Sequence, residues 1–202
     1  MKFKISLTLL FLFISTGLFA QGLDLRLLES INGPINPGPD RDWRALTNSA
    51  NYIDAAVPLS LIITGFIDND DSLKVKGYDV AASLLIAGGS DLVIKDIVKR
   101  ERPYYAHPNL IYAKVKETDY SFPSGHASLA FATATSLSLA YPKWYVIAPS
   151  YLYAGAVGYS RMYLGAHYPS DVLGGAVLGV ASSYLTFKIQ KWLDRKYHHP
   201  AY

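Results

Sequence analysis

The 202-residue sequence contains no cysteine, so neither a disulfide framework nor a thiolate metal site is possible. It also has no strong excess of one charge, because 19 Lys and Arg residues face 16 Asp and Glu residues. This balance favours neither a nucleic-acid partner nor an acidic tail. No stretch shows the alternation of a β-strand, and there is no internal repeat. The length fits one domain with its own core.

Residues 1–20 are typical of a secretory signal peptide. Lys2 and Lys4 precede an apolar run that ends at Phe19, and Ala20 closes the segment before a polar stretch. An uncleaved first membrane helix is the alternative, although the run is short for a span, which needs about 20 residues. Both interpretations direct the chain into the export pathway.

The remainder divides into two parts by composition. Residues 21–51 contain several prolines and glycines, which predicts an amphipathic or irregular segment. Residues 52–202 hold apolar segments rich in Leu and Ala, near 55–67, 79–98, 126–141, 145–159 and 171–190. Their length and composition predict helices. We therefore expect an all-α helical bundle of about five to six helices.

Three features favour a bundle that spans a membrane. Gly175 and Gly179 have the spacing that membrane helices use for close packing. Lys and Arg residues follow the last apolar segment, as a cytoplasmic anchor would. Aromatic residues fall near the ends of the segments, where interfacial belts occur: Tyr141, Trp144, Tyr145 and Trp192 at one side, and Tyr104, Tyr105, Tyr120, Tyr159, Tyr163 and Tyr168 at the other. The apolar cores are short, however, so a soluble bundle is the alternative.

The expected topology places the loops at 99–122 and 160–170 outside, if Lys2 and Lys4 lie in the cytoplasm. This predicts a bacterial-type inner-membrane protein that faces the periplasm or the exterior, with a soluble periplasmic protein as the alternative. The link at 68–79 is more acidic than a cytoplasmic loop should be, and the outer loop at 99–116 is more basic. The basic residues of that outer loop would then need another purpose.

A first cluster of polar residues ends the segment at 79–98. Lys95, Lys99 and Arg102 are spaced to share one helix face, and Pro103 would stop the helix. Such a cluster also suits the negative end of a helix dipole, which is a purely structural explanation.

A second cluster opens the segment at 126–141. Ser124 is a natural helix N-cap, Gly125 permits a close approach of the backbone, and His126 falls in the first turn. An ordinary capped helix with an incidental histidine is one interpretation. The other is an oxyanion site, in which His126 gives or takes a proton.

A third cluster spans residues 160–171. Pro169 suits the first position of a helix, so that His167 precedes the helix and Asp171 lies in its first turn. Asp171 could simply satisfy the helix dipole. Alternatively, it could accept a proton from one His167 ring nitrogen and leave the other nitrogen as a nucleophile or base.

Two histidines and an aspartate could also form a zinc centre. If Lys95, Arg102 and Arg161 converge on the same pocket, however, a divalent cation is repelled and a phosphoryl group is held. These residue types suit phosphoryl transfer, which depends on positioning and charge stabilisation.

Together the three clusters read Lys95-x6-Arg102-Pro103, Pro123-Ser124-Gly125-His126 and Ser160-Arg161-x5-His167-x3-Asp171. This pattern resembles the signature of the type 2 phosphatidic acid phosphatase superfamily, which also includes class A acid phosphatases and vanadium haloperoxidases. All eleven signature residues are present in order. The resemblance covers about residues 52–192 and implies the six-helix membrane form of the family.

The resemblance also implies a mechanism without metal or cofactor. His167 would attack phosphorus and form a phosphohistidine, Asp171 would orient His167, and His126 would protonate the leaving oxygen. The phosphoryl oxygens would be held by a further set of side chains and backbone groups: Lys95, Arg102, Ser124, Gly125, Ser160 and Arg161.

These implications predict a membrane phosphatase whose substrate is a lipid phosphate monoester or pyrophosphate, such as undecaprenyl pyrophosphate, a phosphatidate-type lipid or a lipid A phosphate. The basic outer loops would then serve an anionic substrate, and the loop at 104–121 would select the headgroup. The alternatives are a soluble secreted acid phosphatase of broad specificity, a vanadium haloperoxidase and a non-catalytic membrane protein. No oligomeric state is predicted.

Overall fold

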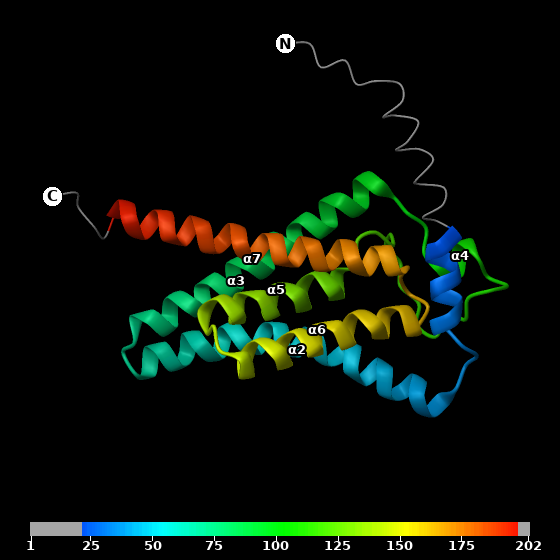
Figure 1. The fold of residues 1–202 in the computed structure, drawn as a ribbon, viewed down its shortest axis with the longest axis horizontal. Helices are drawn as coiled ribbons and strands as arrows, with labels where there is room; N and C mark the ends of the chain where they lie inside the picture. Colours follow the sequence, from blue (N-terminus) through cyan, green and yellow to red (C-terminus); the bar gives the residue numbers. More distant parts are fainter. Residues whose placement is uncertain (1–21, 198–202) are drawn as a thin grey trace, which may run out of the picture.

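Five long helices run along the molecule, and the segments that connect them collect at its two ends (Figure 1). The computed structural model describes residues 22–197. The long helices are α2 (Pro37–Ile67), α3 (Asp71–Val98), α5 (Gly125–Ala140), α6 (Trp144–Tyr163) and α7 (Pro169–Tyr197). A one-turn helix, α4 (Pro103–Ala106), interrupts the long connection from α3 to α5, and a helical segment over 22–31 precedes α2. The expected all-α bundle is confirmed, with no strand among the described residues.

The N-terminal part of the described chain is helical on both sides of a break at 32–36. Pro37 supplies the first turn of α2, and the Asp40 carboxylate accepts a hydrogen bond of 2.8 Å from the backbone N–H of Asn36. Position 52, where the sequence analysis begins the bundle, therefore lies inside α2. The expected signal peptide or first membrane helix at 1–20 lies outside the described residues.

The end of α3 differs from the prediction. The helix stops at Val98, because Lys99 adopts a left-handed conformation with φ 50°. Arg102 lies beyond this stop and precedes α4. The expectation that Lys95, Lys99 and Arg102 share one helix face is therefore wrong, since a left-handed residue ends the helical periodicity between them.

The bundle is built around α5, which contacts α2, α3, α6 and α7 and packs most extensively on α7. The helices approach closely because small residues form their contact surfaces. A Cβ atom on Gly175 would lie 2.5 Å from the Ser124 carbonyl oxygen, and one on Gly179 would lie 2.2 Å from that of Ser128. The spacing noted in the sequence thus forms the α5–α7 contact.

The buried side chains of the helices are small or polar, and many of the large apolar ones are exposed. On α5 every buried residue is Ala, Ser or Thr. Leu85, Leu92 and Ile97 of α3, Leu152 of α6 and Leu173 of α7 are all more than 60% exposed. This arrangement reverses the pattern of a water-soluble bundle. Helices α2 and α7 are also long and apolar enough to cross a membrane.

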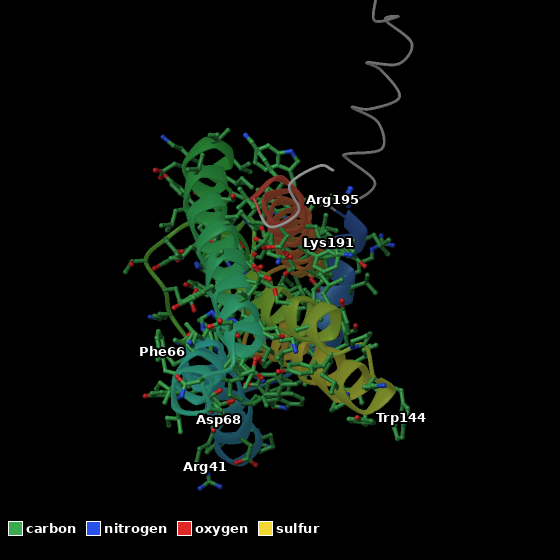
Figure 2. All side chains as sticks on the ribbon, turned by 90° about the vertical axis from the view of Figure 1, so that its left-hand side faces the viewer. Arg41, Phe66, Asp68, Trp144, Lys191 and Arg195 are labelled. Atoms are coloured by element: carbon green, nitrogen blue, oxygen red, sulfur yellow. The ribbon has the colours of Figure 1, made fainter. Side chains whose placement is uncertain are left out.

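The two ends of the bundle differ in what they carry. One end holds the 22–31 segment, the connection from α3 to α5 and the turn from α6 to α7 (Figure 1). The opposite end holds two short turns and the end of α7. Figure 2 looks onto that opposite end, where Phe66 and Trp144 lie at opposite edges and Lys191 and Arg195 lie on α7. All three sequence clusters belong to the first end.

The α5–α7 contact gives a test of the packing. Gly179→Ala should lower the free energy of unfolding by about 1–3 kcal/mol, because the added methyl group overlaps the backbone of α5. Thermal unfolding of the detergent-purified protein measures the change. Gly89→Ala on α3 is the matched control, because no described residue outside the adjoining turns of α3 lies within 4 Å of its added Cβ. Equal melting temperatures for the two variants would contradict the observed contact.

Candidate active site

His167 lies in the turn between α6 and α7 and is almost fully buried. Gly165 makes the turn possible: it has φ +76°, and a Cβ there would lie 2.5 Å from the Tyr112 carbonyl oxygen. The ring Nδ1 of His167 lies 2.8 Å from the Ser121 carbonyl oxygen, which can only accept. In the neutral ring Nδ1 therefore carries the proton, and the lone pair is on Nε2.

The charged group nearest to Nε2 is a cation, and a Glu117 carboxylate oxygen lies farther away, at 3.9 Å. Arg102 places one guanidinium nitrogen 3.1 Å from Nε2. Burial, together with the positive charges of Arg161 and Arg102, lowers the pKa of His167 to about 4, although the Asp171 carboxylate acts in the opposite direction. At neutral pH the ring is uncharged, and Nε2 is a base or nucleophile.

Asp171 is held by several donors at once. One carboxylate oxygen accepts from the Ser121 hydroxyl at 2.5 Å and from the Tyr168 backbone N–H at 2.9 Å. The other accepts from Arg100 at 2.6 Å. Nδ1 of His167 is 3.7 Å from Asp171, so the Ser121 carbonyl is its nearer partner. Asp171 is therefore linked to the ring mainly through its bond to Ser121.

Arg102 and Arg161 converge on a carboxylate that the sequence analysis did not identify. Glu117 lies 2.7 Å from Arg102 with one oxygen, and its other oxygen accepts from Arg161. Burial alone would raise the pKa of Glu117, but Arg161 and Arg102 outweigh burial and leave it below its ordinary value. Helix α2 also contributes, because the Thr47 hydroxyl lies 3.2 Å from Arg161.

Lys95 and Arg102 meet at a second carboxylate of the same loop. Asp119 lies 2.5 Å from Lys95 and also accepts from Arg102. Burial raises the pKa of Asp119, but its bonds to Lys95 and Arg102 prevail and lower it to about 2. Lys95 additionally pairs with Asp91, one turn back on α3, at 3.3 Å. Three cations from three different segments thus share a set of carboxylates.

The loop that supplies Glu117 and Asp119 is anchored upstream. Lys114 forms a fully buried ion pair of 3.1 Å with Asp40 on α2. The Tyr104 hydroxyl accepts from the Glu117 backbone N–H at 2.9 Å. Lys114 and Tyr104, which the sequence analysis placed in a headgroup-selecting loop, are therefore buried and hold the loop in place.

A cavity of about 290 Å³ opens next to this cluster. His126 and His167 line it, together with Lys95, Gly125, Glu117, Asp119, Asn51 and Leu129. His126 lies in the first turn of α5, as predicted, and Ser124 is the N-cap residue. The buried Ser124 hydroxyl caps no backbone N–H and has no hydrogen-bond partner among residues 22–197.

Ser160 is the signature residue that stands apart. Its hydroxyl donates to the Val157 carbonyl of its own helix at 2.6 Å, and it does not line the cavity. Lys95, His126 and His167 line the cavity. Arg102 contacts His167, Arg161 contacts Glu117, and Asp171 contacts Ser121.

Comparison with known proteins identifies the fold and its relatives. The model of the PAP2 superfamily matches residues 76–195. The chain belongs to the PAP2 superfamily. This confirms the resemblance found in the sequence. The helical segment at 22–31 and all of α2 lie outside the matched residues.

Two curated relatives and one solved structure define the similarity. An undecaprenyl-diphosphatase of Sulfolobus acidocaldarius is 37% identical over 115 residues, which are 56% of this chain and 55% of that protein. The chain thus matches about half the length of this relative. A lipid A 4'-phosphatase of Bacteroides thetaiotaomicron is 29% identical over 182 residues, which are 85% of this chain and 78% of that protein. The crystal structure of a transmembrane PAP2-type phosphatidylglycerolphosphate phosphatase from Bacillus subtilis shares the fold, with a TM-score of 0.71, 24% identity and coverage of 95% and 97%.

The charge of Glu117 gives a test of the site. Glu117→Gln should tighten the binding of orthovanadate by about tenfold, or 1.4 kcal/mol, because it removes a competing negative charge between two arginines. Titration calorimetry on the detergent-purified protein measures the dissociation constant. Glu101→Gln, on an exposed side chain of the same connection, is the control. Unchanged or weaker binding in Glu117→Gln would show that Glu117 does not compete with oxyanions.

Proposed function

We propose that this chain is a membrane phosphatase that hydrolyses a lipid phosphate monoester or pyrophosphate through a phosphohistidine at His167, without metal. One observation carries the proposal: a neutral, buried histidine directs its Nε2 lone pair at a cluster of cations that already holds carboxylate oxygens. A nucleophile beside an oxyanion pocket is the requirement of phosphoryl transfer.

In the first step, Nε2 of His167 forms a bond to phosphorus while the bond from phosphorus to the leaving oxygen breaks. His126, in its protonated form, gives a proton to the leaving oxygen. The lipid alcohol or lipid phosphate therefore leaves with a hydroxyl group at that oxygen. The position of both histidines on one cavity supports this division of roles.

In the second step, water attacks phosphorus, His126 takes a proton from the water, and the bond from phosphorus to Nε2 breaks. Inorganic phosphate and neutral His167 result. Lys95, Arg102 and Arg161 stabilise the charge on the phosphoryl oxygens in both steps, and the phosphoryl group takes the place of Glu117 and Asp119 on these cations. The unpartnered Ser124 hydroxyl supplies a further donor.

A lipid substrate in a membrane is favoured by the exterior of the bundle. The exposed leucine and isoleucine side chains on α3, α6 and α7 suit contact with acyl chains, and polar residues are kept inside. The relatives that act on undecaprenyl diphosphate and lipid A by name support the same substrate class. A cavity at one end of the bundle would receive a headgroup at the membrane surface. We propose that this surface faces the periplasm or exterior, in keeping with the topology expected from Lys2 and Lys4.

The direct test is phosphate release in detergent, with EDTA present, from undecaprenyl pyrophosphate, phosphatidate, a lipid A phosphate and a soluble phosphate ester. We expect release from a lipid substrate and a loss of at least about 10³-fold in His167→Ala, as for the removal of other catalytic nucleophiles. His107→Ala is the control histidine on the same end of the bundle. Equal rates on the soluble ester would favour a secreted acid phosphatase, and full activity in His167→Ala would rule out the phosphohistidine.

The pKa of His167 gives a second test. His126 must be protonated in the first step, so kcat/KM should decline at high pH as His126 loses that proton. Protonation of Nε2 removes the nucleophile, so kcat/KM should also fall as the pH drops through about 4. An ordinary histidine would give this fall near pH 6.5, at about its unperturbed pKa. The phosphate of the substrate also ionises, so a monoester and a pyrophosphate should be compared. A fall of kcat/KM at acid pH that both substrates share reports a group of the enzyme. A shared acid-side fall of kcat/KM near pH 6.5 would contradict a nucleophile in this buried setting beside cations.

A further inference from the structure

The helical segment at 22–31 lies outside the part of the chain that matches the PAP2 superfamily, yet it packs against the end of the bundle that carries His167. Leu28 is fully buried in a cluster with Tyr104, Ile111 and Tyr168. Asp24, one turn earlier, is only 6% exposed. A carboxylate buried to this extent requires partners, and its partners lead toward His167.

Asp24 is bound to Ser170 and Arg100. One carboxylate oxygen accepts from the Ser170 backbone N–H at 2.9 Å, in the first turn of α7. The other accepts from the Ser170 hydroxyl at 2.5 Å and from Arg100 at 2.7 Å. Asp24 is therefore both a capping group for α7 and an ion-pair partner for Arg100.

Arg100 contacts both groups that support the His167 ring. Its guanidinium lies 2.6 Å from the Asp171 carboxylate, and its backbone carbonyl accepts from the Ser121 N–H at 2.8 Å. The guanidinium also lies over the Tyr168 ring, 3.9 Å from its centroid. Ser121 in turn donates to Asp171 and accepts from His167 Nδ1.

The two carboxylates together fix the orientation of the Arg100 fork. The guanidinium is planar and directs its two terminal nitrogens at different acceptors, Nη2 at Asp24 and Nη1 at Asp171 and at the Ser170 hydroxyl, 2.7 Å away. With one carboxylate removed, only the other carboxylate and the Ser170 hydroxyl still accept from the guanidinium, so its orientation is less tightly fixed. Asp171 would then lose a donor of fixed direction, and Ser121 would follow because its hydroxyl is bonded to Asp171.

We propose that Asp24 and Arg100 are positioning residues for His167, with Asp24 acting through Arg100 on Asp171 and Ser121. The proposal rests on the proposed function of His167 as the nucleophile. It assigns to a segment outside the superfamily match a part in aligning Nε2 with phosphorus. The competing explanation is structural: Asp24 would only cap α7 through Ser170.

A double-mutant cycle separates the two explanations, with phosphate release from the preferred lipid substrate as the readout. Asp24→Asn should lower kcat about tenfold and change KM less than about twofold, since small misplacements of a reacting group cost rate rather than binding. Arg100→Gln should lower kcat at least as much. If Asp24 acts through Arg100, the double variant should be no slower than Arg100→Gln alone.

Two further variants complete the experiment. Glu29→Gln changes an exposed carboxylate on the same helical segment and should leave kcat unchanged. Arg100→Lys keeps the positive charge but not the planar guanidinium with its two terminal nitrogens. Its kcat should lie between those of Arg100→Gln and the wild type. Should Asp24→Asn fail to fold, as judged by thermal unfolding, the comparison of Arg100→Lys with Arg100→Gln still decides whether charge at this position supports kcat.

The outcomes distinguish this inference from the function on which it rests. An active wild type with unchanged kcat in Asp24→Asn, or with losses that add fully in the double variant, would overturn the inference and leave the proposed function intact. Equal activity of Arg100→Lys, Arg100→Gln and wild type would do the same. A wild type that releases phosphate from no substrate would overturn both.

Discussion

The side chains of Arg102 and Arg161 are each 1% exposed, and the structure of the end that carries the site depends on pairing their charges. A buried charge that loses its partner costs several kcal/mol, so anionic groups must be brought to it. Glu117 and Asp119 meet this need, but they lie on a loop that must cross the end of the bundle. The buried pair of Lys114 with Asp40 fixes that crossing.

Helix packing joins the remaining parts of the site. The close approach of α5 and α7 at Gly175 and Gly179 brings the start of one helix to the start of the other. As a result, the Ser124 backbone N–H donates to the Asp171 carbonyl oxygen at 3.0 Å. The two histidine clusters, which are separated by about 40 residues of sequence, are thus held by backbone contacts between rigid elements.

Local sequence patterns predicted the helices and the starts of α5 and α7. Pro169 begins α7 as expected, whereas α5 begins after Ser124 although the Ser124 hydroxyl makes no capping bond. Motif spacing also indicated which residues would meet. The carboxylates Glu117 and Asp119 could not be found in this way, since their contacts with Arg161 and Lys95 depend on the path of an irregular loop. Asp24 is bonded to Ser170 across 146 positions, which no local pattern reveals. The sequence around Lys99 favoured a continuing helix, but the left-handed conformation of Lys99 ends α3 there.

The site contains two kinds of carboxylate, and the difference explains how a cluster of cations can fold and still admit an oxyanion. Asp171 lies on a helix, has no exposed surface and accepts from Arg100, Ser121 and Tyr168, so it is fixed. Glu117 and Asp119 lie on a loop, and the Asp119 side chain is 48% exposed. The loop carboxylates neutralise the cations in the folded protein. In the proposed mechanism they yield to a phosphoryl group, because withdrawing them requires a change in the loop and leaves the helices in place. In the proposed mechanism the fixed carboxylate has the opposite role, since a nucleophile must keep its direction while the anions around it exchange.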